Sequence, residues 1–163
     1  MRYNKEKLKN TVLYIAKYGG SDVGKKKLAK LLYFIDFTLY ELRKKSVTGI
    51  DYVKMDFGPM PNPKVFYPAM DQLKKNKIIE IKKPNSYKLE KILPKDEPNM
   101  KVFDEKETEI IQQIVEKYRL ENAGTLERLA QSEAPYKMVK YGEKIPYHLA
   151  FYRNSFGEMD LND

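Results

Sequence analysis

Apolar residues are densest between Lys25 and Pro63, in a stretch that predicts a long helix followed by a strand. Leucine and isoleucine side chains alternate there at spacings of four and three residues, which places them in one stripe along an α-helix. The members of this stripe are Leu28, Leu32, Ile35, Leu39 and Leu42. A second apolar row widens the arc beyond that of an ordinary surface helix. We therefore expect a central helix that is packed by neighbours on several sides.

Asp36 lies in the middle of this apolar surface, where an unpaired carboxylate would be costly. We interpret it, together with Tyr33, as a structural anchor that accepts hydrogen bonds from a tyrosine or a backbone amide. Catalysis by Asp36 is the alternative, and it ranks lower because misplaced charges mark structural networks as often as active sites.

The same patterns predict further elements on both sides of the central helix. Before and directly after the central helix, they are a helix over 6–18 and a strand over 50–57. Next come a helix that is capped by Asn62 or starts only at Pro68, and a hairpin of 78–82 with 87–92. The last three are a helix with a capping box of Asp104 and Glu107, a short helix from Thr125 and a helix from Pro146. The buried face of the Asp104 helix is expected to hold Ile110, Ile111, Ile114, Val115 and Tyr118.

These elements predict an α+β fold, a mostly helical single domain around the central helix with one short strand and a small β-hairpin. The order helix, helix, strand, helix, hairpin has winged-helix-like features. We expect a helical core with the strand and hairpin over 1–93, a polar connector over 94–103, C-terminal helices packed on the same core over 104–153, and a flexible tail over 154–163.

The amino-acid composition excludes several kinds of functional site. The chain has no cysteine, which excludes disulfides and thiolate metal sites, and its single histidine, His148, cannot build a histidine metal site. No apolar run reaches the roughly 18 residues that span a bilayer, and the N-terminal residues are too polar for a signal peptide. We therefore expect a cytoplasmic protein without a metal, a cofactor or a membrane contact. The net charge of +8 suits nucleic acid, an acidic protein or an anionic surface equally well.

The residues from Gly19 to Lys26 imitate a phosphate-binding loop but fail its requirements. They match the spacing of GxxxxGK, yet Lys26 stands where a hydroxyl would hold magnesium, and the preceding segment is predicted as a helix rather than a strand. A glycine-rich turn between helices is the better interpretation. No nucleophile with a base and no pair of differentiated carboxylates stands at a meaningful spacing, so we expect a protein that is not an enzyme.

Aromatic residues gather around the sequence FGPMPNPKVFY, which predicts a surface that binds a partner protein. Pro59, Pro61 and Pro63 should prevent regular structure and form a rigid, exposed corner. Core packing explains some of these aromatics equally well. The candidate partner-binding residues are Tyr52, Phe57, Gly58, Pro59, Met60, Pro61, Phe66 and Tyr67.

Lysines are frequent in the predicted hairpin, as they would be in a DNA-contacting wing. The candidates for nucleic-acid contact are Lys82, Lys83, Lys88 and Lys91. The competing interpretation is a solvated edge hairpin that its lysines protect against aggregation. Either way, a DNA-binding regulator of its own operon stays the alternative function.

Several blocks of the sequence resemble the Panacea domain, the SocA-like antitoxin domain found in bacterial and phage genomes. The resemblance is carried by KLAKLLYFIDF, by TG followed by DYV, and by the strand ending in FGPMP, with weaker similarity at AGTLERLAQ, APYK and GEKIPY, and it spans roughly Leu8 to Tyr152. Members often carry a histidine after the LERLA-like helix and a tryptophan after the next proline. This chain has Gln131, Ser132 and Glu133 and then Tyr136 at those places.

The resemblance implies an antitoxin that neutralises a cognate toxin, usually encoded beside it, by direct contact. Some relatives look like adaptors that pass the toxin to an ATP-dependent protease. Neither activity needs catalytic residues, and a shared scaffold says nothing about which toxin is bound.

Overall fold

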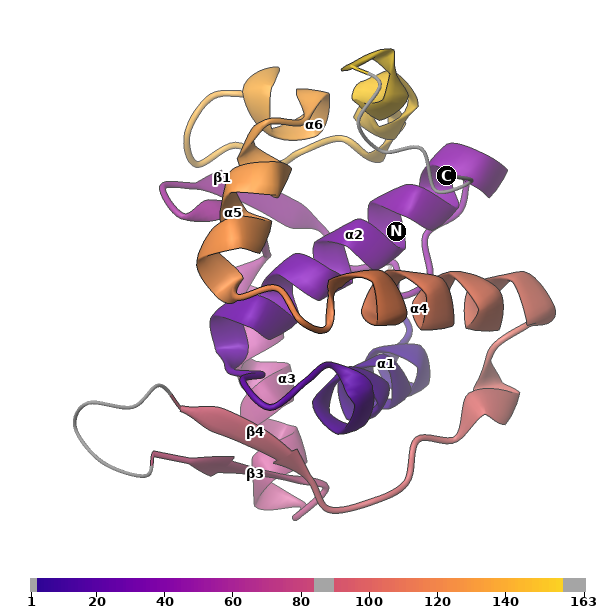
Figure 1. Cartoon of the computed structure of the whole chain (residues 1–163), viewed down its shortest axis with the longest axis vertical. Helices are drawn as coiled ribbons and strands as arrows, with labels where there is room; N and C mark the ends of the chain where they lie inside the picture. Colours follow the sequence, from indigo (N-terminus) through magenta and orange to yellow (C-terminus); the bar gives the residue numbers. More distant parts are fainter. Residues whose placement is uncertain (1–2, 84–89, 157–163) are drawn as a thin grey trace.

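The computed structural model describes residues 3–83 and 90–156. Its framework is helix α2 (Lys25–Arg43), which runs through the middle of the molecule with α1 (Lys5–Tyr18), α4 (Glu105–Tyr118) and α5 (Ala123–Gln131) around it (Figure 1). The fold is a mostly helical α+β domain, as predicted. Thirteen consecutive residues of α2, from Lys27 to Leu39, are buried, so the wide apolar arc is confirmed, although Leu42 at the end of the stripe is exposed.

The predicted single strand is instead a hairpin. Strand β1 (Tyr52–Met55) pairs antiparallel with β2 (Gly58–Pro61), with Asp56 and Phe57 in the turn. The whole of β2 is buried, so the expectation of an irregular, exposed corner is wrong. Proline lacks only an N–H group and is tolerated on an edge strand, and both prolines of β2 occupy such a strand.

Helix α3 (Pro63–Lys75) begins at Pro63, where the Asn62 side chain accepts a hydrogen bond from the backbone N–H of Lys64 at 3.1 Å. The cap predicted at Asn62 is therefore confirmed, and Pro68 lies within the helix without delaying its start. An internal proline removes one backbone hydrogen bond. Burial of Phe66, Met70 and Leu73 on one side of α3 offsets that loss.

A second hairpin follows, formed by β3 (Ile79–Lys82) and β4 (Lys91–Pro94). Its second strand begins later than the predicted 87–92, and it includes Pro94, which the sequence assigns to the connector. The predicted strand residues Tyr87 and Lys88 lie outside the described residues. The hairpin packs against α1 and α3 at one end of the molecule (Figure 1).

The C-terminal third returns to the same core. A short 3-10 turn, η1 (Met100–Val102), precedes α4, whose capping box of Asp104 and Glu107 is confirmed, as is its predicted buried face. Helix α5 begins at Ala123 with Asn122 as its cap, two residues before the predicted start. The one-turn α6 (Ala134–Lys137) follows.

The last element, η2 (Tyr147–Phe156), is a 3-10 helix that packs on α2 and α6. The first residues of the predicted tail, 154–156, belong to η2, and 157–163 lie outside the described residues. Before η2, residues 142–145 run along the free side of β1. Their backbone hydrogen bonds include Lys54 N–H to Glu143 O at 3.0 Å and Ile145 N–H to Tyr52 O at 2.8 Å. The free edge of β1 is therefore covered by residues 142–145.

Candidate partner-binding surface

Asp36 is fully buried and accepts four hydrogen bonds from the segment that follows α2. The donors are Val47 N–H at 2.9 Å, Thr48 N–H at 2.8 Å, the Thr48 hydroxyl at 2.6 Å and the Tyr52 hydroxyl at 2.7 Å. Burial raises the pKa of this carboxyl to about 6, and the same hydrogen bonds oppose the increase. With both oxygens occupied inside the core, Asp36 has the geometry of a carboxylate that fixes the α2–β1 connection.

Tyr33 belongs to a different buried cluster. Its hydroxyl donates to Glu133 at 2.8 Å, and Glu133 accepts two hydrogen bonds from Arg153, at 2.8 Å from Nε and 3.2 Å from Nη2. Arg153 also donates to Thr38 at 3.0 Å and to Glu41 at 3.3 Å. Burial lowers the pKa of the Arg153 guanidinium, but the Glu133 carboxylate outweighs it and the net shift is upward. Arg153 therefore stays charged and joins η2 to α2.

The sequence analysis predicts no buried ion pair at Glu133 or Arg153. Arg153 stands near the end of the chain with no periodic pattern around it, so nothing in the sequence marks it as buried. The burial of Lys30 was not predicted either, although the sequence contains a signal for it. Lys27, Lys30 and Phe34 follow helical spacing along the buried side of α2, and both lysines are only 1% exposed.

The eight predicted partner-binding residues divide between core and surface. The aromatic rings of Tyr52 and Phe66 are fully buried, Met60 is 3% exposed, and Gly58, Pro59 and Pro61 are buried with it. Only Phe57, which is partly buried, and Tyr67, which is 41% exposed, reach the surface. The tyrosine ring lies 5.6 Å from Lys25 Nζ, and the phenylalanine ring lies 5.2 Å from Lys30 Nζ.

Side chains from α2, α5 and α6 donate hydrogen bonds to backbone carbonyls at the turn of the β1–β2 hairpin. Lys30 donates to Pro59 O at 3.2 Å, Gln131 donates to Asp56 O at 3.0 Å, and the Tyr136 hydroxyl donates to Met55 O at 2.7 Å. Burial lowers the pKa of the Lys30 ammonium to about 8. Gln131 is the first residue of the stretch 131–133 in which family members often carry a histidine, and Tyr136 stands at the place of their tryptophan. In this chain both hold the hairpin turn.

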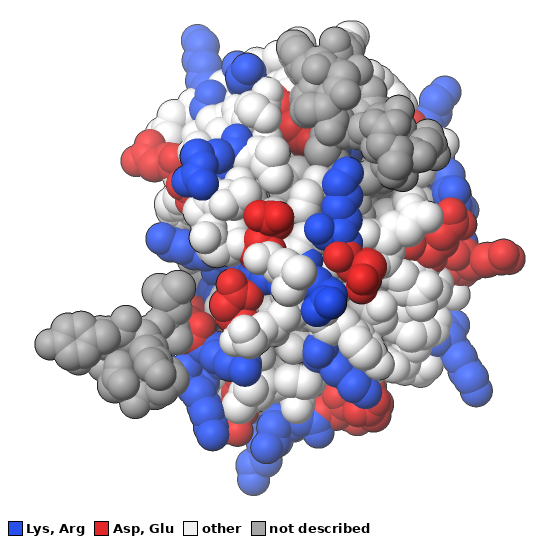
Figure 2. All heavy atoms as spheres, viewed as in Figure 1, with Lys and Arg blue, Asp and Glu red and all other residues white. Residues whose placement is uncertain are grey.

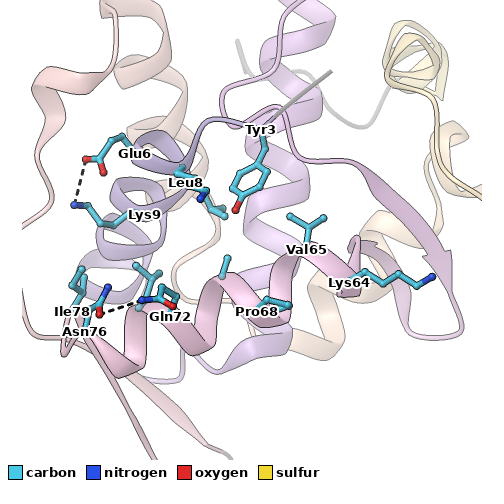
Figure 3. Close-up of a pocket in the computed structure, with 13 residues that line it drawn as sticks. Tyr3, Glu6, Leu8, Lys9, Lys64, Val65, Pro68, Gln72, Asn76 and Ile78 are labelled. Atoms are coloured by element: carbon cyan, nitrogen blue, oxygen red, sulfur yellow. Dashed lines mark hydrogen bonds and ion pairs between the residues drawn. The ribbon is translucent and has the colours of Figure 1, made fainter.

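A groove of about 580 Å³ runs between α1 and α3 (Figure 3). Its floor is apolar and its rim is polar. The apolar lining consists of Leu8, Val65, Pro68, Ala69, Leu73 and Ile78, and Tyr3 lies across one end beside Val65. The rim carries Lys5, Glu6, Lys9, Lys64, Gln72 and Asn76. The groove therefore offers a partner an apolar contact area outside the core.

Basic side chains gather where α3 meets the β3–β4 hairpin (Figure 2). The exposed lysines are Lys74, Lys75, Lys77, Lys82, Lys83 and Lys95, and Lys91 lies partly buried directly opposite Lys82. Of the four candidates for nucleic-acid contact, Lys88 lies outside the described residues. Acidic groups are interspersed, and Glu80 forms an ion pair with Lys95 at 3.6 Å.

Metal-ligating clusters and membrane-spanning helices are both absent from the part of the chain that the structure describes. Over residues 3–83 and 90–156, no three histidine, cysteine or acidic side chains are placed to hold a metal ion. Within the same ranges, no helix has the length and apolar character needed to cross a bilayer. The segment from Gly19 to Gly24 follows helix α1, so the strand required by a phosphate-binding loop is not there.

These features define a mostly helical α+β domain with a covered hairpin and an apolar groove between α1 and α3. The chain belongs to the family described as antitoxin SocA-like, Panacea domain, whose model matches residues 28–137. The match is shorter than the resemblance from Leu8 to Tyr152 and leaves α1 and η2 outside. Comparison with curated proteins and with solved structures gave no match.

Proposed function

We propose that this protein is an antitoxin that neutralises a cognate toxin by direct protein–protein contact. The observation that carries the proposal is the family match over residues 28–137, because the antitoxin description comes with that domain. The toxin should be encoded beside this chain, and its activity is a property of the toxin rather than of this scaffold.

A mechanism without catalysis is part of the proposal. Its support comes from Asp36 and Lys30, two ionisable groups with shifted pKa values that are both buried and both occupied by structural hydrogen bonds. A general acid or base must reach a substrate. The groups with strongly shifted pKa values here face the protein interior instead.

Co-expression tests the proposal directly. The product of the adjacent gene, induced alone, should arrest growth, and co-expression of this chain should restore growth and yield a complex that co-purifies. An unrelated toxin serves as the control and should not be neutralised. If this chain neither binds the adjacent product nor rescues growth, the proposal fails.

Delivery of the toxin to an ATP-dependent protease is a finer form of the same proposal. The toxin's half-life in cells that express this chain distinguishes the two forms. Delivery predicts a toxin that is degraded faster when the protease is present and a loss of rescue when it is deleted. Simple blocking predicts rescue in both strains.

Binding to DNA is a second candidate, favoured by one observation on the β3–β4 hairpin. Lys82 and Lys91 face each other in the strand register, and like charges placed so destabilise a hairpin unless an anion screens them. Fluorescence anisotropy against the operon's promoter at several salt concentrations tests this function. Sequence-specific binding must exceed the salt-sensitive background on unrelated DNA of equal length.

A further inference from the structure

The groove between α1 and α3 has walls of different origin. The α3 wall, with Val65, Ala69 and Leu73, lies inside the residues that match the family. The opposite wall comes from residues 3–9, which lie outside that match. A partner seated in this groove would thus contact both the matched domain and a segment outside that match. That combination suits a scaffold whose partners differ.

Charge on the rim selects for an acidic partner. Among the residues that line the groove, Lys5, Lys9 and Lys64 are basic and Glu6 alone is acidic. That carboxylate lies 3.3 Å from Lys9 Nζ, so these two charges offset each other. Within the described ranges, Lys5 and Lys64 take part in no ion pair, and both are exposed. Lys5 belongs to α1 and Lys64 to α3, so these two ammonium groups come from opposite walls.

The backbone around the groove favours a helical occupant. Both walls are helices, in which backbone groups pair within the element except where Pro68 of α3 has no N–H to donate. At the end of the groove, Ile78 donates to Leu73 O at 2.9 Å and accepts from Lys95 N–H at 2.9 Å. No free strand edge is therefore available along the groove's described lining. An extended segment would bury its own backbone groups unpaired, whereas a helix pairs them internally. From Val65 to Asn76, α3 spans roughly 16 Å, about three helical turns.

We propose that this groove binds an amphipathic helix of the toxin, with apolar anchors at i, i+3, i+4 and i+7 and acidic residues on its flanks. This inference rests on the proposed antitoxin function and assigns its contact surface. It also moves the predicted interface away from the mostly buried FGPMP segment.

Ala69→Glu tests the apolar floor, because it places a carboxylate between the two walls without leaving helix-compatible geometry. The expected result is toxin affinity at least about tenfold weaker, with loss of rescue. Leu120→Glu is the matched control. Leu120 is 81% exposed and lies outside the groove lining, so the same kind of change there should leave affinity unaltered. Circular dichroism and thermal melting establish that both variants fold.

Lys5→Glu and Lys64→Glu test the rim at exposed positions where folding is not at stake. Each should weaken toxin binding several-fold, more at low than at high salt. Lys45→Glu, at another exposed position, changes the net charge equally and should have no effect. A photo-crosslinking amino acid at Gln72 should link to an acidic, amphipathic helix of the toxin, and one at Leu120 should not.

The outcomes separate this inference from the function on which it rests. If the unaltered chain rescues growth and the groove variants bind as tightly as their controls, the groove is not the toxin site and the antitoxin function stands. Crosslinking of Gln72 to an extended or basic toxin segment also overturns the inference. If the unaltered chain fails to bind the toxin, the antitoxin function itself is wrong.

Discussion

Buried ionisable residues are the most informative single residues in this protein. Asp36, Lys30, Glu133 and Arg153 are each no more than 1% exposed, and each uses its polar atoms to join segments that are distant in sequence. A buried charge is tolerated only where its polar atoms are paired. Removal of one partner is thus more damaging than the net contribution of the interaction suggests.

Asp36 should give the protein a measurable pH dependence of stability. Its pKa is raised from 3.8 to about 6 in the folded protein, so the native state holds the proton more tightly than the unfolded state does. The free energy of unfolding therefore falls as pH rises from about 4 to about 6, by roughly 3 kcal/mol, and this contribution is constant above that range.

The variant Asp36→Asn lacks this titration. In urea unfolding, the stability difference between the unaltered chain and Asp36→Asn should be larger at pH 4.5 than at pH 7, since all other groups titrate in both proteins. An equal difference at the two pH values would show that Asp36 has an ordinary pKa.

Gly58→Ala should destabilise the hairpin turn more than Gly142→Ala does. Both glycines have positive φ, +106° and +83°, so both substitutions strain the backbone by about 1 kcal/mol. An added Cβ at Gly58 lies 3.2 Å from Lys30 Cε and Nζ, whereas at Gly142 nothing lies within 4 Å. We expect thermal unfolding to show an additional cost of about 1 kcal/mol for Gly58→Ala, because Lys30 must leave its hydrogen bond. Equal costs would mean that Lys30 moves freely.

At the scale of elements, the structure depends on how the C-terminal segments are fastened to α2. Helix α5, the 142–145 segment and η2 all contact the central helix or the hairpin beside it. The attachment of η2 includes a buried ion pair between Arg153 and Glu133. Elements of this kind are held by a few specific contacts rather than by long apolar faces.

Arg153→Met should cost about 3–5 kcal/mol, because it leaves the Glu133 carboxylate buried without its cation. The double variant Glu133→Gln with Arg153→Met should recover part of that loss. Arg43→Met is the matched control, since the Arg43–Asp104 pair at 3.0 Å is largely exposed and its removal should cost below about 1 kcal/mol. Chemical denaturation of the four proteins measures these differences. A double variant no more stable than Arg153→Met would contradict the ion-pair explanation.

Elements with strong local signals were predictable from the sequence, and those fixed by distant contacts were not. The capping box at Asp104 and the period of α4 are local, so both were found. Lys30, Gln131 and Tyr136 hold the hairpin that contains the FGPMP segment, and the last two lie far along the chain. The local pattern of three prolines does not include these contacts, so it wrongly predicts an exposed corner. The α1–α3 groove likewise depends on how two helices pack, which periodicity alone does not specify.

At the scale of the whole molecule, the family match does not coincide with the folding unit. Residues 28–137 omit α1, with its buried Leu8, Val12, Leu13 and Ile15, and they omit η2 with Leu149, Ala150 and Arg153. All of these except Leu149 and Arg153 belong to one apolar cluster with α2. The shared domain therefore has no complete core of its own.

A chain shortened to residues 28–137 should fail to fold. The apolar side chains that it loses contribute roughly 10 kcal/mol of burial, comparable to the total stability of a small domain. Its circular dichroism should lack a cooperative thermal transition, whereas a chain of residues 3–156, which keeps every described element, should retain one. A cooperative transition in the shorter chain would show that the matched residues fold independently.

The side-chain hydrogen bonds that hold the β1–β2 turn affect how such a protein can change over evolutionary time. Lys30, Gln131 and Tyr136 all donate to backbone carbonyls of the hairpin, and none of these contacts depends on which side chains the hairpin carries. Substitutions at Asp56, whose side chain is exposed, can therefore accumulate while the turn keeps its shape. A hairpin that is held through main-chain hydrogen bonds can change its exposed side chains without losing its shape. A protein needs this property if the partner that it binds changes during evolution.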